Sequence, residues 1–508
     1  MKASERRALS LLLPGEAETA KLGEDLALAL GRGDCLALHG DLGAGKSTLA
    51  RAFLRAMADD QTLEVPSPTF TLVQQYELRY PVAHFDLYRL SDPSELDELG
   101  FDEVLEHGIG LVEWPERADG ALPDDQITLH MAFDGDGRRV EVEGPVAKLD
   151  RIERVLAIRA FLSDHGFGDA RRRFLTGDAS SRAYEYIYAD GQPRRILMDA
   201  PRKPNGPPIR DGKPYSQIVN LAEDVYPFMA IDAMLRDKGF AAPEIIESDG
   251  EAGILLIEDL GTEGILEPDG QPNADRYEAS VACLARLHDT PIERDIRLPE
   301  ERVHRIPDFD RVAMKMEAEL LVDWHLPWSR SGEVASDEER LSYLAIWDGL
   351  IDDLADADTS IVLRDFHSPN IIWREDETGI GKIGLIDFQD AMIGPSAYDL
   401  VSIVQDARVT IDQPLATRLM TRYLTLRAET PGFDEAAFMR SWHIMAAQRS
   451  CKLAGLWVRL MQRDQKPAYM RHMPRTLDYL QAALEHPALT PLRDWCAKAR
   501  IGSVESTR

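Results

Sequence analysis

The chain has 508 residues, of which 44% are apolar and 29% charged, ordinary proportions for a globular protein of about three structural domains. Its net charge of −30 argues against a protein that binds nucleic acid strongly through phosphate contacts. Apolar runs fall short of the ~20 residues of a membrane span, and the short segment Ser10–Gly15 does not make a signal peptide, so we expect a cytoplasmic protein.

A glycine-rich segment near the N-terminus is the first feature that carries chemistry. Residues 16–30 and 49–57 have helical apolar spacing, and Cys35–Leu38 has the pattern of a short buried strand. Between this strand and the second helix lies Gly40–Ser47, a GxxxxGKS motif in the strand–loop–helix context that the motif requires. Its glycines let backbone N–H groups close around phosphates at a helix N-terminus. We therefore expect ATP to be held by Gly40, Gly43, Gly45, Lys46, Ser47 and Thr48.

Later segments supply the polar groups that an ATPase of this kind needs. A proline-bracketed loop offers the hydroxyl of Thr69. Two further strands end on the carboxylates Asp86 and Glu113, and the indole of Trp114 follows the second. Carboxylates at strand ends near a P-loop divide magnesium binding and water orientation between them. His84 is either part of this site or a packed strand residue.

The order GDLGAGKST, SPTFTLV, HFDLYRL and EWPE resembles the TsaE family over residues 15–145. These are small ATPases of the bacterial machinery that makes threonylcarbamoyl-adenosine in tRNA. The resemblance implies that partner proteins, the threonylcarbamoyl-transferase complex, carry out the transfer, and that the ATPase does not itself modify the base. It also implies a set of roles: ATP at Lys46 and Ser47, Mg²⁺ at Ser47, Asp86 and Glu113, nucleotide sensing by Thr69, catalysis by Glu113 and Asp86, and Trp114 close to the nucleotide.

The pattern changes near residue 145. Residues 138–143 alternate like a last edge strand, Gly144-Pro145 ends it, and residues 148–164 have helical spacing. This break predicts a short linker between two domains, 1–147 and 148–508. Because each half contains its own phosphate-binding and magnesium-binding residues, we expect the two fragments to fold and act separately.

The second half begins with a strand, a small-residue turn and a strand over residues 172–188. Such a pattern is typical of a lobe that covers the phosphates of ATP. The turn supplies cofactor contacts, Gly177, Ser180 and Arg182. The next strand carries Met198 where a phosphate-binding lysine is usual, which leaves Arg182 or Lys203 as substitutes.

An apolar strand over residues 253–261 then closes on an acidic turn, and Glu258 marks the backbone groups that we expect to face adenine. One helix is predicted before this strand, at 217–236. The chain after it is largely helical, with predicted helices at 277–288, 316–324, 343–354, 414–429, 438–461 and 476–486. This order predicts a small lobe at about 148–260 and a helical large lobe at about 261–508.

The chemistry of this half lies in residues 362–390. Two apolar strand-like runs are each followed by polar residues, the first by Asp365 and Asn370 and the second by Asp387. Phosphoryl transfer from ATP needs a carboxylate that orients the attacking hydroxyl, and an asparagine and an aspartate that hold Mg²⁺. We therefore expect Asp365 to be catalytic and Asn370 and Asp387 to bind metal.

The D-x-x-x-x-N spacing followed by I-D-F-x-D, with His367 after the catalytic aspartate, resembles the aminoglycoside-phosphotransferase branch of the protein-kinase-like fold. Within that branch, LMDAP, AEDVYPF, IEDLG, RDFHSPNI, IDFQDA and GPSAYDL resemble the AmgK-type cell-wall sugar kinases over residues 155–480. This resemblance implies ATP-dependent phosphorylation of N-acetylmuramate and N-acetylglucosamine at the anomeric hydroxyl. A methionine at the position of Met198 fits the same subgroup.

The sequence thus predicts an α/β P-loop NTPase domain followed by a two-lobed α+β protein-kinase-like domain. ATP and Mg²⁺ are the expected cofactors, and a small amino sugar is the expected partner of the second domain. Two alternatives stay open for that domain: a regulatory pseudokinase, which Met198 favours, and an antibiotic kinase or other hydroxyl kinase of the same fold. The presence of Asp365, Asn370 and Asp387 argues against the pseudokinase.

Overall fold

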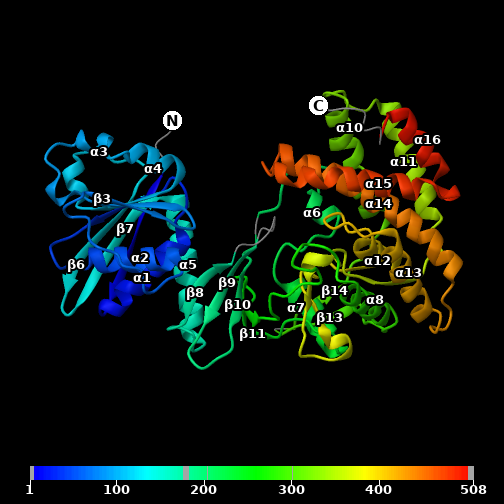
Figure 1. Ribbon diagram of the computed structural model, residues 1–508, viewed down its shortest axis with the longest axis horizontal. Helices are drawn as coiled ribbons and strands as arrows, with labels where there is room; N and C mark the ends of the chain where they lie inside the picture. Colours follow the sequence, from blue (N-terminus) through cyan, green and yellow to red (C-terminus); the bar gives the residue numbers. More distant parts are fainter. Residues whose placement is uncertain (1–4, 176–181, 203, 300, 502–508) are drawn as a thin grey trace. The chain divides into compact units, whose positions relative to one another are not determined.

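The computed structural model describes residues 5–175, 182–202, 204–299 and 301–501 (Figure 1). The chain forms two compact units, Met1–Met198 and Asp199–Arg508, and the division falls within strand β10 (Arg195–Asp199). Among the described residues, the helices include none that is long and apolar enough to cross a membrane.

A seven-stranded sheet forms the centre of the first unit. Strand β2 pairs in parallel with β5 and β6, β4 is parallel to β5, and the outer strands are antiparallel. The central strand β2 is apolar up to its last residue because helices cover both faces of the sheet. The strands in spatial order are β1 (Arg6–Leu13), β7 (Gly137–Pro145), β6 (Ile127–Asp134), β2 (Cys35–His39), β5 (Ile109–Glu113), β4 (Pro81–Asp86) and β3 (Val73–Glu77).

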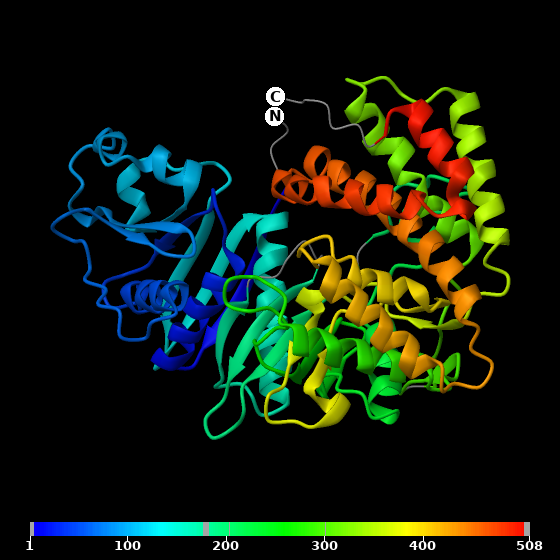
Figure 2. The same cartoon turned by 45° about the vertical axis from the view of Figure 1, so that its right-hand side comes forward.

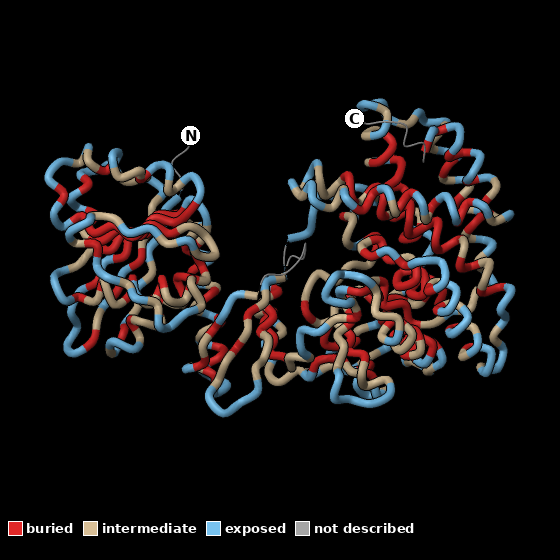
Figure 3. The backbone as a smooth tube through the Cα atoms, viewed as in Figure 1, coloured by how far each residue is buried: buried red, intermediate tan, exposed pale blue. Residues whose placement is uncertain are grey.

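Helices pack on both faces of this sheet (Figure 1), and the strands between them are buried (Figure 3). One face is covered by α1 (Glu16–Ala29) and α2 (Lys46–Ala58), and the other by α3 (Glu95–Glu98) and α4 (Phe101–His107). The helices α1 and α2 approach so closely that a Cβ atom on Gly23 would lie 2.5 Å from the carbonyl oxygen of Leu49. Glycine is therefore required at the crossing of these two helices.

Helix α5 (Val146–Asp164) belongs to the core of the same sheet. Its residues Leu149, Ile152 and Val155 are buried in one cluster with side chains of α1 and α2. Residues 137–164, all of which are described, pass from β7 directly into α5, so the linker expected at Gly144-Pro145 is not present there. The strand β7 and the helix α5 were both predicted from their patterns. However, α5 packs against the sheet of the first unit and does not begin a new domain.

The first unit ends with strands β8 (Arg171–Leu175) and β9 (Ala183–Tyr188), an antiparallel pair in which Arg171 lies opposite Tyr188. These strands match the pattern predicted for residues 172–188. The predicted contacts Gly177 and Ser180 lie outside the described residues, as does Lys203. In both Figure 1 and Figure 2, this hairpin lies next to α5.

The second unit starts with short elements and the antiparallel pair β11 (Ile245–Asp249) and β12 (Ile254–Glu258). The helix predicted at 217–236 is shorter than expected, because α7 (Tyr226–Asp237) begins at Tyr226, after the short α6 (Tyr215–Ile218). Asn220 between them has a positive φ of 53°, which ends helical geometry, and a proline occupies the first turn of α7. The predicted helix 277–288 lies within α8 (Ala274–His288).

Of the remaining predicted helices, those at 414–429, 438–461 and 476–486 form with ends shifted by up to three residues, as α13 (Gln413–Arg427), α14 (Glu435–Gln462) and α15 (Met473–Leu484). The helix predicted at 343–354 starts six residues earlier, as α11 (Asp337–Asp352). The one predicted at 316–324 is divided between α9 (Arg311–Ala318) and the π-helix η3 (Leu321–His325). Three short strand pairs and further helices complete the described part of the unit. The pairs are β13 (Asp295–Arg297) with β14 (Val303–Arg305), β15 (Thr359–Val362) with β18 (Met392–Pro395), and β16 (Ile371–Trp373) with β17 (Ile383–Leu385), and the helices are α10 (Leu326–Ser329), α12 (Ala397–Val404) and α16 (Thr490–Ala499).

Candidate active sites

The glycine-rich loop of the first unit runs from the end of β2 to the start of α2. Gly40, Gly43 and Gly45 have φ values of 142°, 81° and 113°, which residues with a side chain rarely adopt. A Cβ atom on Gly40 would lie 2.5 Å from the carbonyl oxygen of Met131 in β6. The three glycines therefore allow the backbone to turn tightly against the sheet before α2 begins at Lys46.

The side chain of Lys46 is enclosed by this loop and by an aromatic ring. Its Nζ donates to the carbonyl oxygens of Gly40 (2.5 Å) and Asp41 (3.0 Å) and lies 3.9 Å from the ring centre of Trp114. Burial lowers the pKa of Lys46, and the nearby carboxylate of Glu113 opposes this effect. Trp114 thus lies beside Lys46, the lysine predicted to bind phosphate.

Two buried carboxylates face this lysine from neighbouring strands. Asp86 ends β4 and Glu113 ends β5, and the two residues are opposite each other in the parallel ladder. The side chain of Ser47 donates to Glu113 Oε2 (3.0 Å), and His84 Nε2 lies 2.9 Å from Glu113 Oε1. Thr69 donates to Asp86 Oδ2 (2.7 Å). The structure therefore brings together the hydroxyls and carboxylates that the sequence predicted, and His84 is both packed and in contact with the site.

These residues fit a magnesium–nucleotide complex. Magnesium prefers oxygen ligands, and Ser47, Asp86 and Glu113 present oxygens at the same edge of the sheet as the P-loop. The loop supplies N–H groups, and Lys46 supplies positive charge for the phosphates. The hydroxyl of Thr48 donates to Glu16 Oε1 of α1 (3.4 Å), and its contact with the nucleotide stays a prediction.

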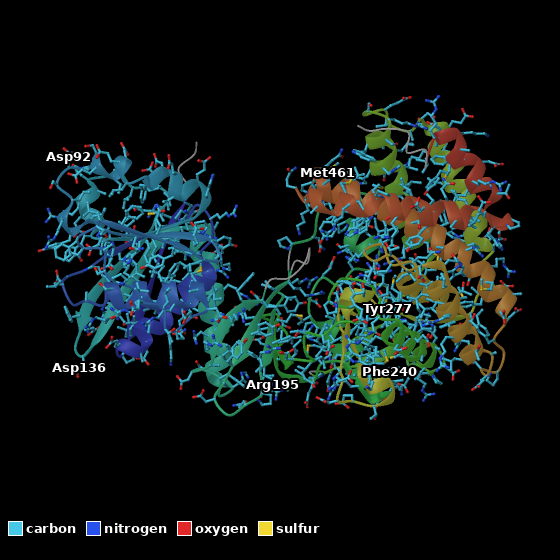
Figure 4. All side chains as sticks on the ribbon, viewed as in Figure 1. Asp92, Asp136, Arg195, Phe240, Tyr277 and Met461 are labelled. Carbon is cyan, nitrogen blue, oxygen red and sulfur yellow. The ribbon has the colours of Figure 1, made fainter. Side chains whose placement is uncertain are left out.

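One residue that braces the P-loop was missed by sequence analysis. Arg138 of β7 donates from Nε to the carbonyl oxygen of Ala44 (2.8 Å) and from Nη2 to that of Gly43 (3.2 Å). Asp136, labelled in Figure 4, marks the turn of the β6–β7 hairpin from which this side chain extends. The sequence alone showed Arg138 only as a polar position of an edge strand.

The second site is built around the loop between β15 and β16. Asp399 of α12 accepts the backbone N–H groups of Leu363 (2.6 Å) and Arg364 (2.9 Å) and so holds the start of this loop. Asp406 accepts both the backbone N–H (3.0 Å) and the hydroxyl (2.6 Å) of Ser368. Arg364 itself has a positive φ of 73°. These bonds fix the backbone on both sides of Asp365.

Asn370 joins the catalytic loop to the second carboxylate. Its Nδ2 donates to the backbone oxygen of Asp365 (3.0 Å) and lies 3.3 Å from Asp387 Oδ2. Asp387 follows β17, has a φ of 59°, and accepts a hydrogen bond from Gln389 (2.8 Å). The structure thus brings together Asp365, Asn370 and Asp387, an all-oxygen set that fits Mg²⁺ beside a carboxylate available to a substrate hydroxyl.

The surroundings of Asp365 favour its charged form. Burial raises its pKa, but the electrostatic effects of His367, Lys452 and Arg449 outweigh this and hold the pKa well below the usual value. Burial lowers the pKa of His367 to about 4, so Lys452 and Arg449 supply the positive charge at neutral pH. Its side chain is 38% exposed, so the carboxylate reaches solvent. An ionised carboxylate of this kind is suited to orient the acceptor hydroxyl and to take its proton late in the transfer.

A buried ion cluster behind the loop was not predicted. Glu317 of α9 pairs with Arg364 and with Lys452 Nζ (2.8 Å), and Gln448 donates to it (3.1 Å). Burial raises the pKa of Glu317, but Arg364 and Lys452 outweigh it and bring the value to about 2. From α14, Arg449 donates to the carbonyl oxygen of Arg364 (3.2 Å). The polar side of α14 therefore supports the catalytic loop.

The other predicted cofactor contacts lie elsewhere in the two units. Glu258 ends β12, where its carboxylate accepts the N–H of Glu244 (3.1 Å) and lies 3.5 Å from Arg374. Arg182 is partly exposed and precedes β9. Met198 is buried in β10.

Comparison with known proteins finds two families in the chain. Residues 13–140 match the family model described as threonylcarbamoyl adenosine biosynthesis protein TsaE, and residues 171–438 match that of the phosphotransferase enzyme family. An N-acetylmuramate/N-acetylglucosamine kinase of Caulobacter vibrioides is 33% identical over 68% of this chain and 96% of its own length. A kinase of the same name from Pseudomonas aeruginosa is 28% identical over 65% and 88%. The TsaE protein of Rickettsia conorii is 43% identical over 25% of this chain and 73% of its own length.

Proposed function

Because the chain belongs to the phosphotransferase enzyme family and, through its N-terminal part, to the TsaE family, we propose that it is a bifunctional protein. One part hydrolyses ATP in support of tRNA threonylcarbamoyladenosine modification. The other transfers the γ-phosphoryl group of ATP to the anomeric hydroxyl of an amino sugar, N-acetylmuramate or N-acetylglucosamine. We place the functional division at residues 1–147 and 148–508; the family matches themselves cover residues 13–140 and 171–438.

The grouping of Asp365, Asn370 and Asp387 carries the kinase proposal. Asn370 and Asp387 would hold Mg²⁺, which neutralises charge on the phosphates of ATP. Asp365 would orient the sugar hydroxyl and accept its proton. The cluster of Glu317 and Arg364 keeps the loop in place, so the carboxylate remains positioned without substrate. A pseudokinase would not need this complete set.

In the first unit, Lys46 and the P-loop N–H groups would bind the phosphates of ATP, and Ser47 and Asp86 would hold Mg²⁺. Glu113 would then orient the attacking water, with His84 fixing its carboxylate by the 2.9 Å contact. We propose that proteins of the threonylcarbamoyl-transferase machinery are its partners, because relatives named for this tRNA modification match the same residues. ATP and tRNA are cytoplasmic molecules, which supports a cytoplasmic location.

A phosphotransfer screen tests the kinase activity. The full chain is incubated with ATP, Mg²⁺ and one acceptor at a time: N-acetylmuramate, N-acetylglucosamine, an aminoglycoside, or a choline-like alcohol. We expect phosphate transfer to the two amino sugars and none to the other acceptors. Transfer to the aminoglycoside alone would replace the proposal by an antibiotic kinase, and transfer to none would favour the pseudokinase.

The tRNA role is tested in cells that depend on this chain for the modification. We expect wild-type chain, but not the Lys46→Ala variant, to maintain threonylcarbamoyladenosine in digested tRNA, measured by mass spectrometry. The Asp365→Asn variant is the matched control, because it removes the other activity and leaves the P-loop unchanged. Equal amounts of the modified nucleoside with Lys46→Ala and with wild type would contradict the proposal.

A further inference from the structure

Three consecutive arginines of β8 connect the two family segments. Residue 171 is the first that matches the phosphotransferase model, whereas α1 and α2 lie within the TsaE match. Because side chains alternate along a strand, Arg172 points to one face of the hairpin and Arg171 and Arg173 to the other. Both sets reach the helices of the ATPase segment.

Arg172 is fully buried between α1, α5 and β9. It donates from Nη1 to Asp25 Oδ1 of α1 (2.8 Å) and to the carbonyl oxygen of Val155 of α5 (3.2 Å). Its Nε and Nη2 bind the two oxygens of Glu185 in β9 (2.7 and 2.9 Å). The exposed fraction of its side chain is 0%. The bidentate pair with Glu185, together with the contact to a second carboxylate, Asp25, fixes the orientation of the guanidinium group.

Asp25 is shared by a second arginine. Arg159 of α5 contacts it through Nη2 (2.9 Å) and Nε (3.1 Å) and also reaches Glu24 (3.3 Å). Each buried charge in this group therefore has an opposite charge beside it. Since buried ion pairs of this kind hold their partners in one geometry, the hairpin and α1 are expected to move together.

On the other face, β8 holds the end of the P-loop helix. Asp59, the residue that ends α2, accepts from Arg171 Nη1 (2.7 Å) and lies 2.9 Å from Arg173 Nε. The opposite end of α2 begins at Lys46. One rigid helix therefore joins the phosphate-binding lysine of the ATPase to the first strand of the phosphotransferase segment. On the face of Arg172, a cation–π contact between Arg79 and Phe174 of β8 (4.6 Å) adds a further link to the ATPase segment.

We infer that this contact surface is a domain interface that couples the two nucleotide sites. Occupancy of the P-loop shifts α2, and Asp59 passes the shift to β8, the strand that begins the ATP-binding lobe. The inference rests on the proposed function for the second site and goes beyond it by giving that site a regulator within its own chain. Coupling of this kind is reciprocal for binding and typically amounts to about 5–150-fold in affinity.

The test uses the full chain and a cycle of two substitutions. Lys46→Ala removes phosphate binding at the P-loop, and Asp59→Asn removes the charge that holds β8. Asparagine tolerates the positive φ of 51° at this position, so the end of α2 keeps its shape. Asp60→Asn is the matched control, because the adjacent Asp60 is exposed and its carboxylate accepts hydrogen bonds from the backbone and the hydroxyl of Thr62.

We expect Lys46→Ala to change the KM for ATP in sugar phosphorylation by about fivefold or more in the wild-type and Asp60→Asn chains. In the Asp59→Asn chain the same substitution is expected to change it by less than about twofold. An equal change in all three backgrounds, or no change in any, would overturn the coupling. A wild-type chain that phosphorylates no sugar would instead refute the proposed function.

A second readout does not depend on the sugar. Hydrogen exchange of the amides of β8 and β9 is measured with saturating ADP in the wild-type and Lys46→Ala chains. We expect slower exchange in wild type, because both nucleotide sites are filled there. Identical exchange in the two chains would overturn the inference even if sugar phosphorylation is observed.

Discussion

Cutting the chain at residue 147 is expected to unfold the ATPase segment, although the sequence alone led us to expect fragment 1–147 to fold. The cut removes α5, whose residues Leu149, Ile152 and Val155 are at most 9% exposed within the core of the sheet. Burial of one such side chain contributes about 1.5–3 kcal/mol, so the three contribute about 5–9 kcal/mol. This is comparable to the whole stability of an ordinary domain, about 5–15 kcal/mol.

The assay is urea unfolding of fragments 1–147 and 1–198, followed by circular dichroism. We expect a cooperative transition for 1–198, which contains the entire first unit, and none for 1–147. Within 1–198, Leu149→Ala is expected to cost about 3–5 kcal/mol. Asp150→Ala, on the exposed side of the same helix, is expected to cost little. Equal stability of the two fragments would refute the assignment of α5 to this core.

Three further predictions test the two sites and one buried group. Asp365→Asn is expected to lower kcat for sugar phosphorylation by about 100-fold or more with KM for ATP unchanged, and near-normal turnover would exclude Asp365 as the base. Both Lys46→Ala and Glu113→Ala are expected to stop ATP hydrolysis. Only Lys46→Ala is expected to weaken nucleotide binding, measured by calorimetry, and equal losses of affinity in the two variants would contradict these roles. Burial raises the pKa of Asp232 from 3.8 to about 7, so folding keeps it protonated and stability falls as pH rises between these values. Asp232→Asn is therefore expected to raise Tm more at pH 8 than at pH 5. The control Asp237→Asn, on the exposed side of α7, is expected to show no such difference. Equal gains in Tm for Asp232→Asn at both pH values would argue against the raised pKa.

The P-loop and both carboxylates of the first site were predictable because their geometry is local. A glycine loop between a strand and a helix has one phosphate-binding conformation, and the carboxyl ends of adjacent parallel strands meet at one edge of a sheet. For the same reason, Asp86 and Glu113 could be placed together without a structure. In the second site, Asp365 and Asn370 lie five residues apart in one loop, so their proximity could also be predicted from the sequence.

The features that were missed depend on contacts between distant parts of the chain. Helix α5 has an amphipathic pattern, but the pattern does not say which sheet it covers. Likewise, the three arginines of β8 indicate only a charged strand until Asp25 and Asp59 are placed beside them. Glu317 and Lys452 are each unremarkable as polar positions of a helix, and only folding makes them a buried pair. The late start of α7 did have a local signal, the proline in its first turn.

The position of the transferred phosphate tests the central claim most directly. The full chain is incubated with ATP, Mg²⁺ and N-acetylglucosamine, and the products are followed by phosphorus NMR. The account predicts one new phosphate ester whose phosphorus couples to the anomeric proton, and its absence with Asp365→Asn. Release of inorganic phosphate without any ester, or an ester at another hydroxyl, would contradict it.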